Sequence, residues 1–482
     1  RGTIGRSRKH MQKYYDMRAI GKFPQRLKPI SKRPGLTQMR LGITYNEIYS
    51  QLVSLSLVAY SPSLFIQPSK LDRYEAQAEA QGKNLSLRGR EEGIRHLMSI
   101  NLLKRLESSV YSFRLTLDRV RHAVSTNLQL ISDFELNQNA AFDVDETDNG
   151  AMNQDFDIED QESDLFVVGK SIQIDLRDMD YISWKYEMQK DLETLDLLIS
   201  MVADITPDKD EKLQDLKRLL LDKIEHPINP GNKKVLIFTA FADTAEYLYR
   251  ELGPFMKSKN NIDTALITGS GKGKTTLDGV GSDFNVILTC FSPISKDRSA
   301  LEFDESKNID LLIATDCISE GQNLQDCDYL VNYDIHWNPV RIIQRFGRVD
   351  RIGSRNRCIQ LVNFWPDMDL DEYINLKSRV ETRMKISVMT STGDDDPINV
   401  EEKGDLEYRR RQLKKLQDEV VDIEDMSEGI SIMDLGLNEY RLDVMDYLKD
   451  HEEITRMPFG MHTVVPATDE LPPGSIFILK NI

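Results

Sequence analysis

The residues with the strongest chemical pattern are 344–353, which read QRFGRVDRIG. They follow Asn338-Pro339, where we expect a helix to begin because proline is tolerated in the first helical turn. In a continuous helix, four of these residues would share one face, since their spacings are three, four and seven: Gln344, Gly347, Arg348 and Arg351. Two guanidinium groups on one face can neutralise an anion that gains charge during a reaction, as a transferred phosphoryl group does. The alternative is a surface helix whose arginines pair with Asp350 and other acids.

A second polar segment, residues 314–324, reads ATDCISEGQNL and follows directly from the apolar run 309–313. A strand that ends in a turn of small residues leaves backbone N–H groups facing a cleft that phosphates can approach. Gly321 permits close backbone approach, and Asn323 can hydrogen-bond a ribose hydroxyl. Asp316 gives the strand the look of a magnesium-binding strand, but no second carboxylate follows it.

Residues 269–276, GSGKGKTT, look at first sight like the loop GxxxxGK[ST] that cradles phosphates. The spacing is wrong, because the residue five positions before Gly273 is Thr268 rather than glycine. We therefore predict a flexible loop here. Asp371-Glu372 falls in a helical pattern beyond the predicted sheet and does not supply a carboxylate pair for Mg²⁺.

Short apolar runs alternate with polar helical stretches from residue 233 onwards, which is typical of a parallel sheet covered by helices on both faces. The runs are 234–239, 263–267, 285–289, 309–315, 328–333 and 358–364. Upstream, apolar residues recur at helical spacing over 42–60, 88–124 and 179–225. The sequence therefore predicts an α/β fold in which a parallel sheet is preceded by a helical region and followed by a small α/β accessory unit.

The composition is that of an ordinary globular chain, long enough for about three compact units. Of its 482 residues, 40% are hydrophobic and 29% are charged, and we find no apolar stretch long enough to span a membrane. The net charge of −17 hides an asymmetry: residues 1–33 carry eleven Lys or Arg against one acid, and residues 143–165 carry ten Asp or Glu and no base. The basic end either attracts phosphates or forms a solvated tail, while the acidic stretch predicts a flexible surface insertion.

The cysteines and histidines give no pattern of a metal site. The four cysteines are Cys290, Cys317, Cys327 and Cys358, with no CxxC spacing and no histidine at metal-ligand spacing. The seven histidines form no catalytic cluster. We expect free thiols in a reducing compartment, a cytoplasmic location and no bound structural metal.

Residues 309–353 together resemble motifs V and VI of superfamily-two helicases and translocases, and more narrowly the Swi/Snf-like branch. The resemblance rests on three segments: GQNL at 321–324, DIHWNP at 334–339 and the run 344–353. In addition, KVLIFT at 234–239 resembles motif IV, and Thr268-Gly269 sits where this family has a Thr-Gly pair. The resemblance covers roughly residues 210–385 and extends more weakly over 1–130. It implies a RecA-like second helicase lobe.

The resemblance also implies a role for each matching position. Arg348 and Arg351 would be arginine fingers that face the γ-phosphate of ATP, with support from Gln344. Nucleotide contacts would come from three residues: Gly321, Asn323 and Gly347. The nucleic-acid backbone would be contacted without sequence reading by four residues: Thr239, Thr268, Gly269 and Thr315.

On this basis the chain is expected to contain six parts. They are the basic end of a first helicase lobe (1–40), a helical brace or linker (41–132), an acidic insertion (133–165), a helical lead-in (166–232), the RecA-like lobe (233–390) and an accessory unit (391–482). We expect the ATP-loading half, with the ligands of Mg²⁺, to lie upstream of Arg1. The chain would then be a fragment of a longer polypeptide and inactive alone.

Two functions from different classes are open at this point. In the first, the chain is the C-terminal motor lobe of a nucleic-acid-dependent ATPase, which uses ATP with Mg²⁺ and moves along nucleic acid; the resemblance favours double-stranded DNA as the track. In the second, the chain is a non-catalytic scaffold that binds RNA polymerase or a subunit of a defence complex. Neither function involves a membrane.

Overall fold

In the computed structural model, the described residues are 21–38, 43–80, 87–136, 143–145, 173–269, 272–300, 304, 306–318, 322–335, 339–367, 414 and 417. The chain divides into two compact units, residues 1–22 with 427–482 and residues 23–426. All the described helices and strands lie in the second unit. Most of the expected acidic insertion (133–165) and of the expected accessory unit (391–482) lies outside the described residues.

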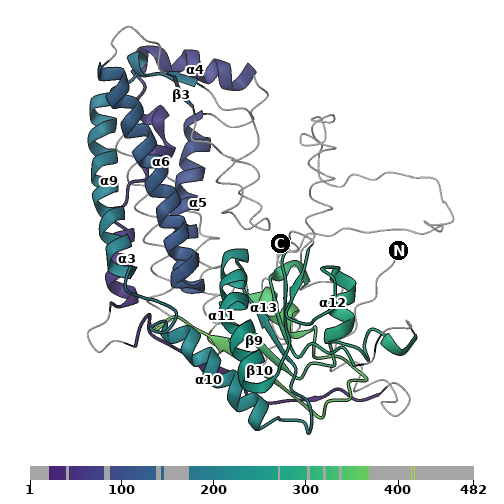
Figure 1. Ribbon diagram of the computed structural model, residues 1–482. Coiled ribbons are helices and arrows are strands. Elements are labelled where there is room, and N and C mark those ends of the chain that lie inside the picture. The colour runs from purple at the N-terminus through teal and green to yellow at the C-terminus, as the bar shows by residue number, and fades with distance from the viewer. Residues whose placement is uncertain are drawn as a thin grey trace, which may run out of the picture. The chain divides into compact units, whose positions relative to one another are not determined.

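A mostly parallel sheet forms the centre of the second unit (Figure 1). Its strands follow the order β1-β10-β9-β5-β8-β6-β7, and β2 also pairs with β10. Among the described strands of this sheet, β6 and β7 form the one antiparallel pair. The strands are β1 (Gln25–Arg26), β2 (Ile30–Lys32), β5 (Val235–Phe238), β6 (Thr264–Ile267), β7 (Lys274–Thr275), β8 (Leu311–Ala314), β9 (Tyr329–Asn332) and β10 (Cys358–Phe364). The predicted RecA-like α/β fold is confirmed.

Helices cover both faces of the sheet because its strands bury side chains on both sides. Val235 and Ile237 of β5 join one core with α10 and α11, and the alternate residues Leu236 and Phe238 join another with α12 and α13. This period of two follows from strand geometry, and it places α12 and α13 on the same face. The four helices are α10 (Glu211–Glu225), α11 (Ala242–Asn260), α12 (Phe284–Phe291) and α13 (Pro339–Phe346).

Residues 285–289, which the apolar pattern predicts to be a strand, belong to helix α12 instead. Asp283 caps this helix, since its Oδ1 accepts a hydrogen bond from the N–H of Val286 at 3.0 Å. A short apolar run cannot be assigned to strand or helix by periodicity alone, and the capping aspartate favours the helix. The strand prediction for this run was therefore wrong. Ile287 and Phe291 are fully buried against the sheet.

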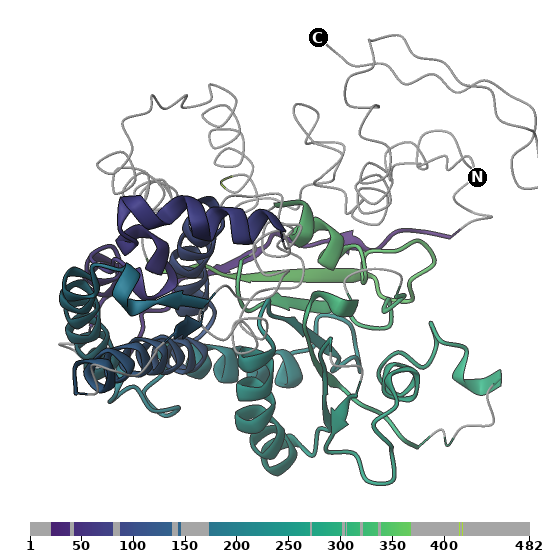
Figure 2. The same ribbon diagram turned by 90° about the horizontal axis from the view of Figure 1, so that it is seen from above.

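The N-terminal strands β1 and β2 extend the sheet by pairing in parallel with β10, and Figure 2 shows them running along its edge. They lie in the segment 1–40, which the resemblance assigns to the end of a first lobe. The described part of that segment, residues 21–38, adds strands to the central sheet of the second unit. The pairing of Gln25 with Cys358 joins residues more than 300 positions apart, which no local pattern reveals.

The upstream region is helical, as predicted, but the long pattern at 88–124 forms two helices that meet at Ser109. Trp184 is fully buried in the core of this region and donates from Nε1 to the carbonyl oxygen of Val58 at 2.9 Å. None of the helices in the described part of the chain combines the length and the apolar character needed to cross a membrane. The helices are α3 (Tyr45–Leu52), α4 (Pro68–Ala80), α5 (Leu87–Ser108), α6 (Val110–Leu136) and α9 (Tyr181–Val202), with a small antiparallel pair of β3 (Asp143–Asp145) and β4 (Gln173–Asp175).

The end of α5 attaches the helical region to the RecA-like lobe. Lys212 on α10 donates hydrogen bonds to the carbonyl oxygens of Glu107 and Ser108 at 2.5 and 2.9 Å. A cation thus sits at the C-terminal end of α5, where the helix dipole favours positive charge. Its ammonium lies 4.3 Å from the centre of the Tyr333 ring. Burial lowers the pKa of Lys212 to about 8.

Replacing Lys212 by methionine should change how stability depends on pH. In the folded protein Lys212 releases its proton near pH 8, whereas in the unfolded chain it keeps the proton up to about pH 10.4. Between these values the unfolded state binds more protons. The free energy of unfolding of the wild type should therefore rise with pH relative to that of Lys212→Met, by up to about 1.4 kcal/mol per pH unit. Urea unfolding of both proteins from pH 7 to pH 10 measures this difference, and a difference that does not vary with pH contradicts the assignment.

Candidate functional site

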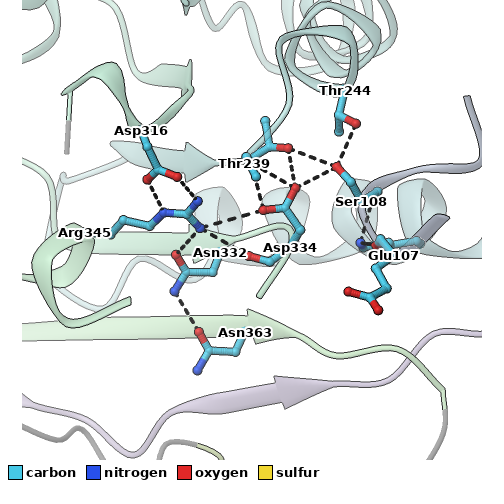
Figure 3. Close-up of polar contacts among 11 residues, drawn as sticks. Glu107, Ser108, Thr239, Thr244, Asp316, Asn332, Asp334, Arg345 and Asn363 are labelled. Carbon is cyan, nitrogen blue, oxygen red and sulfur yellow. Dashed lines mark hydrogen bonds and ion pairs between the residues drawn. The ribbon is translucent and has the colours of Figure 1, made fainter. Parts of the chain in front are cut away.

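Polar side chains meet at the carboxyl ends of the parallel strands. Thr239 follows β5, Asp316 follows β8, and Asp334 comes shortly after β9. Because the carboxyl ends of parallel strands share one edge of a sheet, these residues lie close together, and Arg345 reaches them from α13 (Figure 3). This edge is where open α/β sheets usually bind ligands.

Arg345 and Asp316 form a buried ion pair through two parallel hydrogen bonds. The Nε–Oδ1 and Nη2–Oδ2 distances are both 2.6 Å, and the arginine side chain has no exposed surface. Its Nη1 also donates to Asn332 Oδ1 and to the backbone carbonyl oxygen of Asp334, each at 3.2 Å. A guanidinium bonded in this way holds the fold together and is not available to a ligand.

Asp334 connects the sheet to the end of α5. Its carboxylate accepts hydrogen bonds from Thr239 Oγ1 at 2.5 Å, from Ser108 Oγ at 2.7 Å and from the N–H of Ala240 at 2.9 Å. Ser108 is also hydrogen-bonded to Thr244, with 2.8 Å between the two hydroxyl oxygens. Figure 3 shows the resulting chain of contacts from Asp316 to Thr244. The α5–α6 junction is thereby tied to the strand ends of the lobe.

Helix α13 begins at Pro339, as expected, and ends at Phe346. The sequence spacing had predicted a helix that continues through Arg351, and this prediction was wrong. The N–H of Gly347 still bonds to the carbonyl of Ile343 at 2.9 Å, whereas the N–H of Arg348 bonds to the carbonyl three residues earlier, at 3.1 Å. The chain therefore tightens into turns after Phe346. A methyl group added at Gly347 would lie 3.3 Å from the Gln344 carbonyl oxygen, so the tight turn favours glycine.

Arg348 and Arg351 leave the end of α13 partly buried and in contact with backbone carbonyls. Arg348 donates from Nε to the Gln344 carbonyl at 3.3 Å and from Nη1 to the Gln322 carbonyl at 3.4 Å. Arg351 donates from Nε to the Gly347 carbonyl at 3.3 Å. Burial lowers the pKa of Arg351, and no carboxylate offsets this effect.

The neighbouring Asp350 forms an ion pair with Arg26 of β1. The Arg26 Nε donates to Asp350 Oδ2 at 2.7 Å, and Nη2 lies 2.5 Å from the same oxygen. This contact joins the edge strand to the turn that carries the candidate arginine fingers.

The candidate nucleotide-binding residues lie beside Arg348, as far as the structure describes them. The N–H of Leu324 bonds to the Arg348 carbonyl at 3.1 Å, so the loop carrying Asn323 runs against the end of α13. Asn323 is exposed, and Gly321 lies outside the described residues. The side-chain oxygen Oε1 of Gln344 is buried without a hydrogen-bond partner, which leaves it able to accept one from a ligand.

The predicted nucleic-acid contacts lie at the carboxyl ends of β5, β6 and β8. Thr239 is fully buried, and its hydroxyl donates a hydrogen bond to the Asp334 carboxylate. Thr268 and Thr315 are each 8% exposed, and Thr315 donates to Cys317 Sγ at 3.3 Å. At Gly269 an added Cβ would meet nothing within 4 Å. The structure thus brings these residues to one edge, and their contact with nucleic acid stays a prediction.

The lysine- and threonine-rich stretch at 269–276 is not the flexible loop that its composition suggests, where the structure describes it. Lys274 and Thr275 form β7, which returns antiparallel to β6. Lys274 Nζ forms an ion pair with Glu246 Oε1 at 2.6 Å. The hydroxyl oxygen of Thr276 accepts a hydrogen bond from the N–H of Thr264 at 3.0 Å. The segment is therefore a hairpin strand held by side-chain contacts.

The described residues at this edge do not fit a magnesium site. Both carboxylate oxygens of Asp316 accept hydrogen bonds from Arg345. The Asp334 carboxylate accepts hydrogen bonds from Ser108, Thr239 and Ala240. Across the described part of the chain, no group of three or more His, Cys, Asp or Glu side chains could hold a metal ion. No catalytic step through Mg²⁺ can be assigned to the described residues.

Arg345 is the residue of this site that the motif pattern failed to single out. A signal was present, because Arg345 lies three residues after Ile342 and four before Val349, which are both buried and apolar. An arginine on the apolar face of a helix requires a buried acidic partner. Asp316, which follows the apolar strand, is that partner.

Thr239, Asp316, Asp334 and Arg345 of the strand-end site lie within a segment that matches a known domain family. Residues 211–353 match the model of the helicase conserved C-terminal domain. Over this segment the chain is therefore similar to the C-terminal domains of superfamily-two helicases, including the Swi/Snf-like branch. This confirms the resemblance drawn from the motifs.

Individual relatives match over a short segment. The chain is 42% identical over 66 residues to the uncharacterized ATP-dependent helicase YqhH of Bacillus subtilis, over 14% of this chain and 12% of the relative. It is 38% identical over 74 residues to the RNA polymerase-associated protein RapA of Pectobacterium atrosepticum, over 15% of this chain and 8% of the relative. Each match spans a small part of the relative's length. The helicase domain of Pyrococcus furiosus Hef superposes with a TM-score of 0.33 at 17% identity, over 76% of this chain and 59% of that one, and nothing below rests on it.

Removing Arg345 should destabilise the lobe strongly. Arg345→Ala leaves the Asp316 carboxylate buried and unpaired, which should lower the free energy of unfolding by about 3–5 kcal/mol. Arg357→Ala, at an exposed arginine, should change it by less than about 0.5 kcal/mol. Urea unfolding followed by circular dichroism measures both. Equal, small losses in the two variants would show that the ion pair does not stabilise the fold.

Proposed function

We propose that this chain is the C-terminal motor lobe of a nucleic-acid-dependent ATPase and that Arg348 and Arg351 are its arginine fingers. The observation that carries the proposal is the contrast between the arginines of one motif. Arg345 is held in an internal ion pair with Asp316. Arg351 donates one hydrogen bond to a backbone carbonyl, and burial lowers its pKa with no carboxylate to oppose that effect. A partly buried guanidinium of this kind is suited to an incoming anion.

Phosphoryl transfer is the chemistry that we assign to these two arginines. Negative charge spreads over the oxygens of the transferred group, and positive groups fixed beforehand stabilise it without reorganisation. Gln344, with its unpartnered buried oxygen, and the loop carrying Asn323 adjoin the same turn. We assign Gln344 to the support of the arginines, and Gly321, Asn323 and Gly347 to nucleotide contact.

The nucleotide would be ATP with Mg²⁺, bound between this lobe and a first lobe that supplies the metal ligands. Since the described carboxylates of the strand-end site are occupied, this lobe contributes cations rather than metal ligands. Closure of the two lobes would bring the arginines to the γ-phosphate, as gated active sites commonly do. The lobe alone should therefore hydrolyse ATP at a negligible rate.

The track would be nucleic acid, with double-stranded DNA preferred because of the similarity to the Swi/Snf-like branch. Thr239, Thr268, Gly269 and Thr315 lie at the strand ends, where backbone contacts need no base reading. The buried Thr239 would need its hydrogen bond to Asp334 to open, or would act by placing the Ala240 backbone instead. The intact protein would move along the backbone as ATP hydrolysis drives one lobe against the other.

Loss of either proposed finger should abolish turnover without unfolding the protein. In a protein that joins this chain to its first lobe, Arg348→Ala and Arg351→Ala should each lower DNA-stimulated phosphate release by about 10³-fold or more. Arg355→Ala, at an exposed arginine of the following loop, is the matched control and should keep the wild-type rate. Normal turnover in both finger variants would show that the finger assignment is wrong. Absence of DNA-stimulated phosphate release from the wild-type protein would favour the scaffold function.

A further inference from the structure

Lys296 lies beside the loop that contacts Arg348, outside the motif segment 309–353. It follows α12, which covers the same face of the sheet as α13. Its Nζ donates a hydrogen bond to the side-chain oxygen Oε1 of Gln322 at 2.5 Å. The backbone carbonyl oxygen of the same Gln322 accepts from Arg348 Nη1 at 3.4 Å. One residue therefore contacts both cations.

The segment that carries Lys296 is anchored to the same loop. The Asp326 carboxylate accepts hydrogen bonds from the N–H groups of Ile294 and Ser295 at 2.7 and 2.9 Å. This carboxylate is thus used by the backbone before Lys296 and holds it in place. Side chains on segments fixed in this way are preorganised for a ligand.

Lys296 and Arg351 are both cations that burial separates from water. Both side chains are partly buried, burial lowers the pKa of each, and no carboxylate opposes that effect in either case. A cation that loses hydration without gaining a counter-charge is stabilised when an anion arrives. An anion with several negative oxygens could serve both groups and Arg348 as well.

We propose that Lys296 is a third cation of this site and that it contacts the polyphosphate chain of a bound nucleotide together with Arg348 and Arg351. This inference rests on the proposed function and extends it to a residue on another element. A lysine ammonium has three N–H donors, of which Gln322 uses one, so a polyphosphate supplies acceptors for the others. A nucleic-acid backbone offers the same phosphate chemistry, and the experiment distinguishes the two sources.

Acetylation of lysine amines, followed residue by residue by mass spectrometry, tests the contact without ATP hydrolysis. The probe is sodium tripolyphosphate added to the 482-residue chain, with sodium sulfate of matched ionic strength as the blank. Tripolyphosphate should slow acetylation of Lys296 several-fold and leave the exposed Lys259 of α11 unchanged. A DNA duplex at equal phosphate concentration should protect Lys296 no better than sulfate. Protection by the duplex alone, or no protection at all, overturns the proposal.

Matched variants separate this inference from the proposed function. In isothermal titration calorimetry, Lys296→Met should weaken tripolyphosphate binding about tenfold, Lys296→Arg should restore it, and Lys259→Met should not weaken it. If Arg348→Ala and Arg351→Ala lose binding while Lys296→Met keeps it, only the lysine contact is wrong. If the wild type does not bind tripolyphosphate, or if none of the three cations matters, the lysine contact is overturned, whereas the proposed function is tested separately by phosphate release from the protein joined to its first lobe. Where Lys296→Met does not fold, the acetylation result decides.

Discussion

The ion pair between Arg345 and Asp316 sets the geometry of the strand-end site. A guanidinium with no exposed surface must keep its carboxylate, because either partner left alone would be an unpaired charge in a medium that solvates it poorly. The pair joins α13 to the end of β8, and further contacts to Asn332 and the Asp334 carbonyl join it to the region of β9. The chain that follows α13 starts from this fixed point, and so do Arg348 and Arg351.

The three arginines of one short motif therefore divide into a buried anchor, Arg345, and two partly buried candidates for catalysis, Arg348 and Arg351. Arg345 lies on the apolar side of α13, and the helix ends one residue later, so Arg348 and Arg351 belong to the turns that follow. On the other side of the strand ends, Asp334 bonds to Ser108, and Lys212 bonds to the last carbonyls of α5. The helical region is thus attached at the edge where the predicted nucleic-acid contacts gather. A shift of α5 would be felt first by Asp334 and Thr239.

The sequence predicted the sheet well because most of its strands are continuous apolar runs, buried on both faces. Such runs can be recognised from the local sequence alone. It failed at 285–289, where an equally apolar run is a helix and the deciding residue, Asp283, stands outside the run. It also extended α13 too far, because spacing alone does not show where a helix tightens into turns. The pairing of β1 with β10 and of Arg26 with Asp350 joins residues more than 300 positions apart. Such contacts cannot be predicted from local patterns in a single sequence. Lys296 was missed for the same reason, since only the fold brings it to Gln322.

A structure of the intact protein with ADP and aluminium fluoride is the most direct test, because the fluoride stands in for the phosphoryl group in flight. We expect guanidinium nitrogens of both Arg348 and Arg351 within about 3 Å of the fluoride, with the Arg345–Asp316 pair unchanged. Arg345 at the fluoride, with Arg348 and Arg351 turned toward carboxylates of the protein, would contradict this division of roles.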